Sequence, residues 1–118
     1  LFNRGQEQVA RAEAARRRTD AERQALRTRI ESEVRVSHAA ASRYRELADR
    51  YRSGSVERAA ELAAIATAGY EEGEYGILEL LDAHRVTLGA GLRLLELSAA
   101  ARRAAIELDR AIGQETTP

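Results

Sequence analysis

The chain has 118 residues, no cysteine and a formal net charge of zero, with 44% hydrophobic and 32% charged residues. This length allows one domain at most, or a piece of a larger protein. Zero cysteine excludes disulfides and thiolate metal sites. A neutral chain offers no excess of positive charge for nucleic acid or an anionic membrane. Alanine, leucine, arginine and glutamate dominate, a composition typical of long helices and coiled coils.

No apolar run approaches the length of a membrane span, and no signal peptide is visible. The chain starts at Leu1 and contains no methionine. We therefore expect it to be a processed or excised segment of a longer protein.

The first predicted element is a long helix over residues 1–70, with Asn3 as a candidate N-cap. Small and apolar residues recur in it at spacings of four and three, the seam of a left-handed coiled coil; they are Ile30, Val34, Ser37, Ala41, Tyr44, Ala48 and Tyr51. Gly54 is a weak point, because an interior glycine costs about 1 kcal/mol relative to alanine. A kink and a true break are both compatible with it, and we expect one long helix, kinked or frayed there.

Three glycines within eight residues, Gly69, Gly73 and Gly76, predict a tip turn over residues 71–76. A second helix is predicted over residues 77–113, ended by Gly113, with a disordered tail over 114–118. Its expected seam against the first helix is Ile77, Leu81, His84, Leu88, Gly91, Leu95 and Ser98. The predicted fold is all-α: a long antiparallel helical hairpin.

The two predicted helices differ in length. At 1.5 Å per residue the first would span roughly 100 Å and the second about 54 Å. Folded back, the second covers only about residues 35–70 of the first. Isolated helices need tertiary contacts for most of their stability. We therefore expect missing sequence or other subunits to cover the N-terminal half, and the isolated chain to self-associate.

No pattern for catalysis, a cofactor or a metal site is present, which argues against an enzyme. The two histidines, His38 and His84, are far apart in sequence. His84 could join Asp82 in a cation site of an oligomer, but a polar seam position explains it more simply. The consecutive arginines at 16–18 could contact phosphates, but acidic residues nearby at 13, 20 and 22 favour a solvated face of mixed charge.

Glu79 and Asp82 are unusual because they lie within a strongly apolar run, "ILELLDA". Three residues apart, they share one helix face. One interpretation pairs Asp82 with Arg85 in an exposed ion pair. The other directs both carboxylates at an aqueous lumen between several copies, and the residues alone favour neither.

The stretch "GYEEGEYGILELLDAHRVTL" resembles the tip motif of the TolC-like outer membrane efflux proteins, the CusC-like or CzcC-like heavy-metal branch being nearest. Matching positions are Tyr70, Gly73, Leu80, Leu81, Asp82, Ala83 and Arg85, while His84 stands where glutamine is common. The opening "LFNRGQEQVARAEA" resembles the family's passage from a β-strand into a long periplasmic helix. "AAIELDRAIG" is similar to its closing helix.

The resemblance implies a homotrimer in the parent protein, located in the cell outer membrane, with this chain in the periplasmic portion. It implies that the tip contacts a periplasmic adaptor protein, itself bound to an inner-membrane pump. It places Tyr75, Glu79 and Asp82 at the pore aperture. Three copies of the two carboxylates would then ring the closed tip and favour cations.

The implied function is a tunnel segment that gates export of small molecules or metal cations. The alternative is a generic coiled-coil interaction or scaffold module, which gives Gly73 and Asp82 no special role. The two differ upstream of Leu1, where the efflux assignment predicts about ten residues of alternating polarity, the signal of a barrel strand.

Overall fold

The computed structural model describes residues 3–113, and the regular secondary structure there is entirely helical. In chain order the helices are α1 (Asn3–Tyr51), the π-helix η1 (Arg52–Val56), α2 (Glu57–Glu71) and α3 (Ile77–Ala111). The predicted all-α class is therefore confirmed. The predicted tail over 114–118 lies outside the described residues. The chain divides after Val36 into two compact units, which are taken in turn.

The first unit is a single helical stretch in which every residue from 4 to 33 is exposed. Its apolar side chains are uncovered, with Val9 58%, Leu26 57% and Ile30 46% exposed. Ion pairs between residues four apart, such as Arg18–Glu22 at 2.8 Å, lie along its surface. Such pairs contribute only about 0.2–0.5 kcal/mol each.

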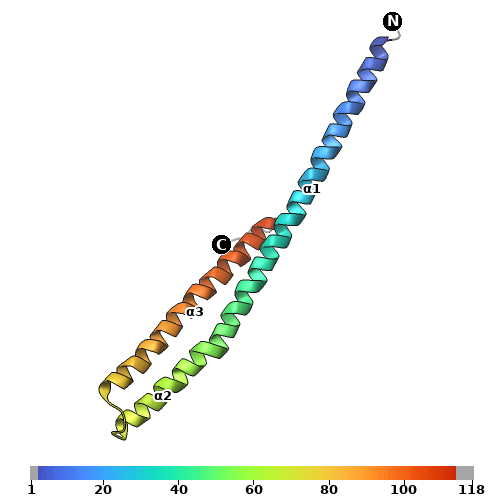
Figure 1. Cartoon of the computed structure of the whole chain (residues 1–118). Helices are drawn as coiled ribbons and strands as arrows, with labels where there is room; N and C mark the ends of the chain where they lie inside the picture. The colour runs from blue at the N-terminus through green and yellow to red at the C-terminus, as the bar shows by residue number, and fades with distance from the viewer. Residues whose placement is uncertain (1–2, 114–118) are drawn as a thin grey trace. The chain divides into compact units, whose positions relative to one another are not determined.

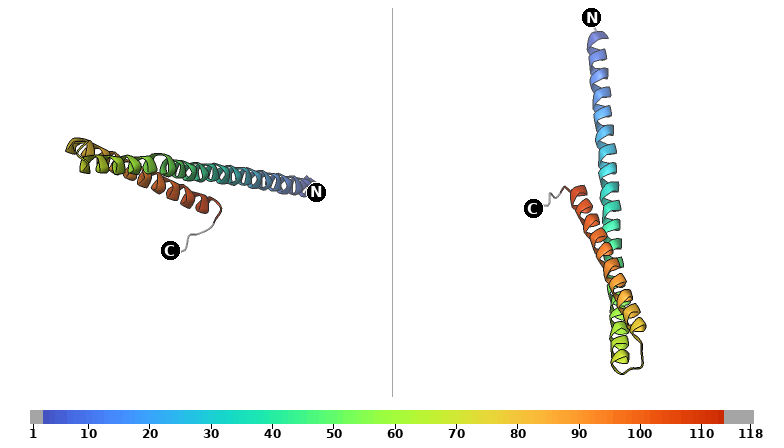
Figure 2. Two further views of the ribbon diagram at one scale, coloured as in Figure 1. Left: turned by 90° about the horizontal axis from the view of Figure 1, so that it is seen from below. Right: turned by 90° about the vertical axis from the view of Figure 1, so that its left-hand side faces the viewer.

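The second unit is a helical hairpin in which α2 and α3 run antiparallel, side by side (Figures 1 and 2). Its buried side chains are almost all alanines: Ala41, Ala48, Ala59, Ala63, Ala66 and Ala90, joined by Leu97. Among the described residues no polar or charged side chain is buried. Small side chains let the two helix backbones approach closely, so the hairpin has a thin core.

The predicted seam of the first helix is confirmed in its main positions. Ala41 and Ala48 are buried, and Val34, Ser37 and Tyr51 are half-buried. Two positions fit less well, because Ile30 at the start of the seam and Tyr44 in its middle remain 46% and 41% exposed.

The predicted seam of the second helix is wrong at five of its seven positions, since only Gly91 and Ser98 are half-buried. The residues of α3 that turn inward also alternate three and four, but they are Leu80, Ala83, Thr87, Ala90, Leu94, Leu97 and Ala101. Ile77, Leu81 and Leu88 from the predicted seam are 51%, 55% and 70% exposed. The alanines of α2 bring the helices too close for a full row of leucines, so the face with smaller residues is buried.

Gly54 neither breaks nor ends the helix, because it lies within η1, which joins α1 to α2. A π-turn holds one more residue than an α-turn. After η1, the pattern of buried residues is therefore displaced by one position toward the C-terminus. The seven-residue spacing from Ala41 to Ala48 would next select positions 55 and 62, whereas Leu62 is 56% exposed and Ala63 is buried.

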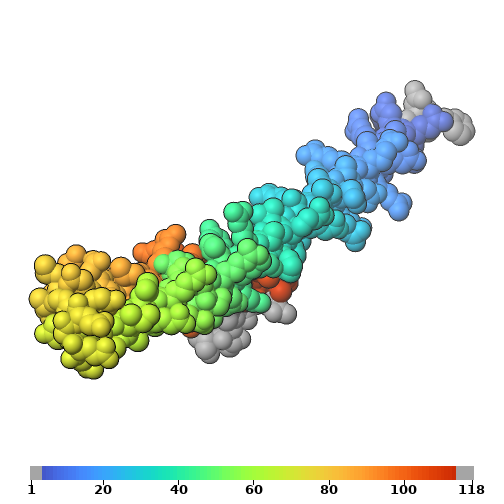
Figure 3. Space-filling view, turned by 60° about the horizontal axis from the view of Figure 1, so that its bottom comes forward, coloured from blue at the N-terminus to red at the C-terminus, as the bar shows by residue number. Residues whose placement is uncertain are grey.

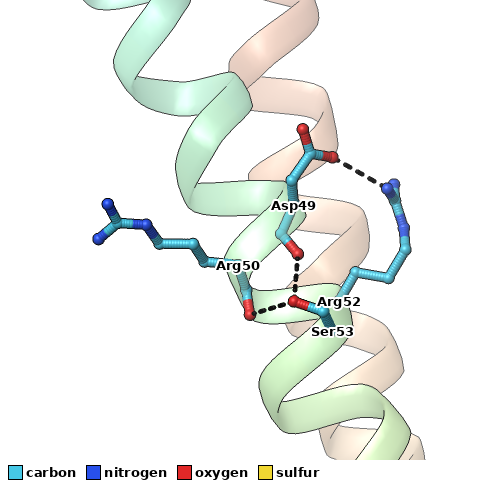
Figure 4. A network of polar contacts seen from close by, with 4 residues as sticks. All are labelled: Asp49, Arg50, Arg52 and Ser53. Atoms are coloured by element: carbon cyan, nitrogen blue, oxygen red, sulfur yellow. Dashed lines mark hydrogen bonds and ion pairs between the residues drawn. The ribbon is translucent and has the colours of Figure 1, made fainter.

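Polar groups around η1 satisfy backbone oxygens at the π-turn (Figure 4). The Ser53 hydroxyl lies 3.2 Å from the Asp49 carbonyl oxygen and 3.4 Å from that of Arg50. The Arg52 guanidinium donates to the Asp49 carboxylate at 3.0 Å.

Within residues 3–113, no helix is both long and apolar enough to cross a membrane.

Candidate functional site at the hairpin tip

The turn that joins α2 to α3 is fixed by backbone hydrogen bonds at the end of α2. The amide of Gly73 donates to the Tyr70 carbonyl at 3.1 Å, and that of Glu74 to the Gly69 carbonyl at 2.8 Å. This pair of bonds defines a Schellman motif. It needs a left-handed residue after the helix, and Gly73 has φ of +77°. In the space-filling view the tip residues close the end of the hairpin as one continuous surface (Figure 3).

Gly69 has a second role, which is to make room for an aromatic ring. A Cβ atom at this position would lie 2.4 Å from Cδ2 of Tyr75. The Tyr75 ring therefore lies directly against the helix backbone, and the Tyr75 amide also donates to the Gly69 carbonyl at 3.0 Å. The ring packing and the hydrogen bonds of the turn therefore stabilise each other. They hold Tyr75, the predicted aperture residue, beside α2.

Glu79 lies at the start of α3, where a carboxylate stabilises the helix. Gly76 is the N-cap, with φ −85° and ψ 170°, and Glu79 is the acidic residue of the first turn. The Glu79 side chain folds back over the N-terminus, because a Cβ on Gly76 would lie 2.7 Å from its Oε2. A negative charge there interacts favourably with the helix dipole. One of the two unusual carboxylates thus has a local structural explanation.

A groove between α2 and α3 begins just behind the tip. It has a volume of about 360 Å³ and is lined by Leu62, Ile65, Ala66, Tyr75, Glu79, Asp82, Ala83 and Val86. The walls are apolar, with Leu62 56%, Ile65 57% and Val86 50% exposed. The two carboxylates lie on the side nearer the tip. An apolar groove with an acidic rim suits a ligand or partner that combines aliphatic and cationic groups.

The residues singled out by the tip motif lie in three different surroundings. Leu80 and Ala83 are half-buried against α2, so their role is packing. Tyr70 and Leu81 are 44% and 55% exposed, and Arg85 is exposed on α3. Tyr75, Glu79 and Asp82 line the same groove, as does Ala83, and Gly73 shapes the turn beside it.

The tip carboxylates have no arginine partners in the part of the chain that the structure describes. The ion pairs there join residues within 7–22, 46–52, 93–96 and 107–110. The simple interpretation of Asp82 as the ion-pair partner of Arg85 is therefore not supported. No group of three acidic or histidine side chains among the described residues is arranged to hold a metal ion.

Sequence reasoning missed four residues that matter here. Thr87 donates to the Ala59 carbonyl across the hairpin at 3.0 Å and also lies 3.0 Å from the Ala83 carbonyl. Leu62, Ile65 and Val86 line the groove. Thr87 fits the inward spacing of α3, which could have identified it. Leu62 and Ile65 could not be identified, because the shift at η1 decides which side of α2 they lie on.

Comparison of the chain with models of protein families, with curated proteins and with solved structures finds no match.

Proposed function

We propose that this chain is the periplasmic tunnel segment of a trimeric outer membrane efflux channel, with the hairpin tip docking to a periplasmic adaptor and gating export. The observation that carries the proposal is the distribution of apolar side chains. Alanines fill the hairpin's own interface, while large apolar residues stay exposed on both of its faces, such as Ile65 on one and Leu88 on the other. A hairpin of this kind is suited to stand between two neighbours in a closed wall.

The exposed N-terminal half of α1 supports the same proposal. Residues 4–33 are uncovered while carrying apolar side chains such as Val9 and Leu26. A wall of several hairpins would supply neighbours for this stretch. A tunnel that is longer than one hairpin requires helices that overlap one another along its length.

The gate is proposed at the tip, where carboxylates without arginine partners gather. In a trimer, the copies of Glu79 and Asp82 would form a ring of up to six carboxylates, a number that follows from the three-fold assembly. Such a ring attracts cations and repels anions. Contact with an adaptor would shift the population between closed and open arrangements of the hairpins.

The test is the conductance of the full-length trimer in planar bilayers. Glu79→Ala combined with Asp82→Ala should lower cation selectivity and weaken block by divalent cations. The matched control is Glu107→Ala, which removes an exposed carboxylate far along α3 that pairs with Arg110. It should leave both the selectivity and the divalent block unchanged. Unchanged selectivity in the double variant would refute the acidic ring. Absence of any channel would favour a coiled-coil scaffold instead.

A further inference from the structure

The tip end of the hairpin is strongly acidic, although the whole chain has a formal net charge of zero. Residues 59–84 contain no arginine or lysine. The acidic side chains in this stretch are all exposed, and they are Glu61, Glu71, Glu72, Glu74, Glu79 and Asp82. The arginines that balance them lie elsewhere along the chain. This end of the hairpin therefore has a negative local potential, which attracts cations.

The groove behind the tip has a polar end and an apolar end. Along α3, Glu79 and Asp82 are nearer the tip and Val86 is farther from it. Tyr75 lies at the tip end, where its ring packs against Gly69. Glu79 and Val86 are seven positions apart, which is about 10 Å along a helix. The groove thus places an aromatic ring and two carboxylates at one end and continues between aliphatic side chains toward the other.

We infer that this groove binds a single amphiphilic ammonium ion, with the cationic group at the tip end and the aliphatic chain between the helices. The exposed carboxylate of Asp82 belongs to none of the ion pairs between described residues, so it can pair with a ligand cation. A quaternary ammonium group also interacts favourably with the face of a tyrosine ring, here Tyr75. The aliphatic chain would contact Leu62, Ile65 and Val86.

Size and chemistry favour this ligand over others. The groove volume of about 360 Å³ is at the lower end of the roughly 300–1,000 Å³ of small-molecule sites, which suits one short amphiphile. A metal ion fits less well, because no three acidic or histidine side chains among the described residues are arranged to hold one. A neutral apolar molecule would gain nothing from the carboxylates, and an anion would be repelled by them.

The inference goes beyond the proposed function and does not depend on it, because a single hairpin forms the whole groove. The test is isothermal titration calorimetry of the 118-residue chain with octyltrimethylammonium, at a protein concentration where light scattering gives the mass of one chain. Neutral octanol and the anion octanoate carry the same aliphatic chain and control for charge. The cation should bind about tenfold more tightly than octanol, because the ring and the carboxylates act on the charged group only. Octanoate should bind most weakly.

Two pairs of variants locate the site. Asp82→Asn should weaken binding of the cation about three- to fivefold and leave octanol unchanged, whereas Glu107→Gln, far from the groove on α3, should affect neither probe. Ile65→Ser should weaken both probes, whereas Leu88→Ser, outside the groove, should weaken neither. Ile65 and Leu88 are 57% and 70% exposed, so neither change removes a buried contact.

Equal affinities for the cation and for octanol would overturn the inference, and so would no detectable binding of the cation at millimolar concentration. Equal effects of Ile65→Ser and Leu88→Ser would place the bound molecule outside the groove and overturn it as well. Binding of an arginine-containing amphipathic peptide, but not of the small cation, would reject the small-molecule site in favour of a protein partner. A chain that binds the cation while the full-length protein forms no channel would preserve this site and reject the conduit.

Discussion

Deletion of Gly54 tests whether the π-turn absorbs one extra residue. With the glycine removed, η1 can become an ordinary α-turn and the residues after it keep their positions. Ala59 and Ala63 then stay buried against α3. The helix also loses an interior glycine, which costs about 1 kcal/mol relative to alanine. We expect the free energy of unfolding to stay the same or rise by up to about 1 kcal/mol.

Deletion of Gly89 is the matched control, because it removes the same residue type from α3, which contains no π-turn. There the rest of the helix must rotate by about 100°. Ser98 would replace Leu97, which is now only 6% exposed. Loss of that leucine alone costs about 1.5–3 kcal/mol, and Arg102 would turn toward the interface. We expect at least about 3 kcal/mol of destabilisation.

The assay is urea unfolding followed by far-ultraviolet circular dichroism, at one fixed protein concentration because the chain is expected to self-associate. Gly54→Ala gives the propensity effect alone, since a Cβ there meets nothing within 4 Å. If deletion of Gly54 destabilises the hairpin as much as deletion of Gly89, the register argument is refuted.

Two substitutions test the contacts that hold the hairpin. Thr87→Val removes the bond to the Ala59 carbonyl at 3.0 Å and should cost about 0.5–1.5 kcal/mol; an unchanged urea midpoint would show that the bond contributes nothing. Gly69→Ala places a Cβ 2.4 Å from the Tyr75 ring, so the ring must leave its place and the tyrosine fluorescence and tip stability should both change. Retention of the native ring environment by nuclear magnetic resonance would contradict that expectation.

The turn and the unequal helix lengths could be predicted from the sequence, because both depend only on the order of residues along the chain. Gly73 at a left-handed position identifies the turn, and α3 is shorter than the combined length of α1 and α2, so part of α1 must stay uncovered. The inner face of α3 could not be predicted in the same way. Two seams, one through Leu81 and Leu88 and one through Thr87 and Ala90, have the same spacing. Only the small residues contributed by α2 decide between them.

The groove was unpredictable for a related reason. Before η1 the seven-residue pattern places Leu62 in line with Ala48, and a simple extrapolation would bury it. The π-turn rotates α2 by one residue, so alanines face α3 and Leu62 and Ile65 turn outward. A single glycine-containing turn thus decides whether large side chains form the hairpin core or a surface for a neighbour. π-turns are often found at functional sites, and this one creates an apolar surface.

The two unusual carboxylates can now be separated by experiment. Glu79 has a structural role at the N-terminus of α3, so Glu79→Gln should lower the stability of the hairpin by about 0.3–1 kcal/mol. Asp82 lies beyond the first turn, and the structure contains no ion pair for it among the described residues. Asp82→Asn should therefore change stability by less than about 0.5 kcal/mol.

In the proposed full-length channel the order of effects should reverse. Asp82→Asn should lower cation selectivity, because it removes a negative charge from the groove rim that has no structural role within the hairpin. Urea unfolding of the chain and bilayer conductance of the channel measure the two properties on the same variants. If Asp82→Asn destabilises the hairpin while leaving selectivity intact, Asp82 is a structural residue, and the case for an acidic aperture at this tip fails.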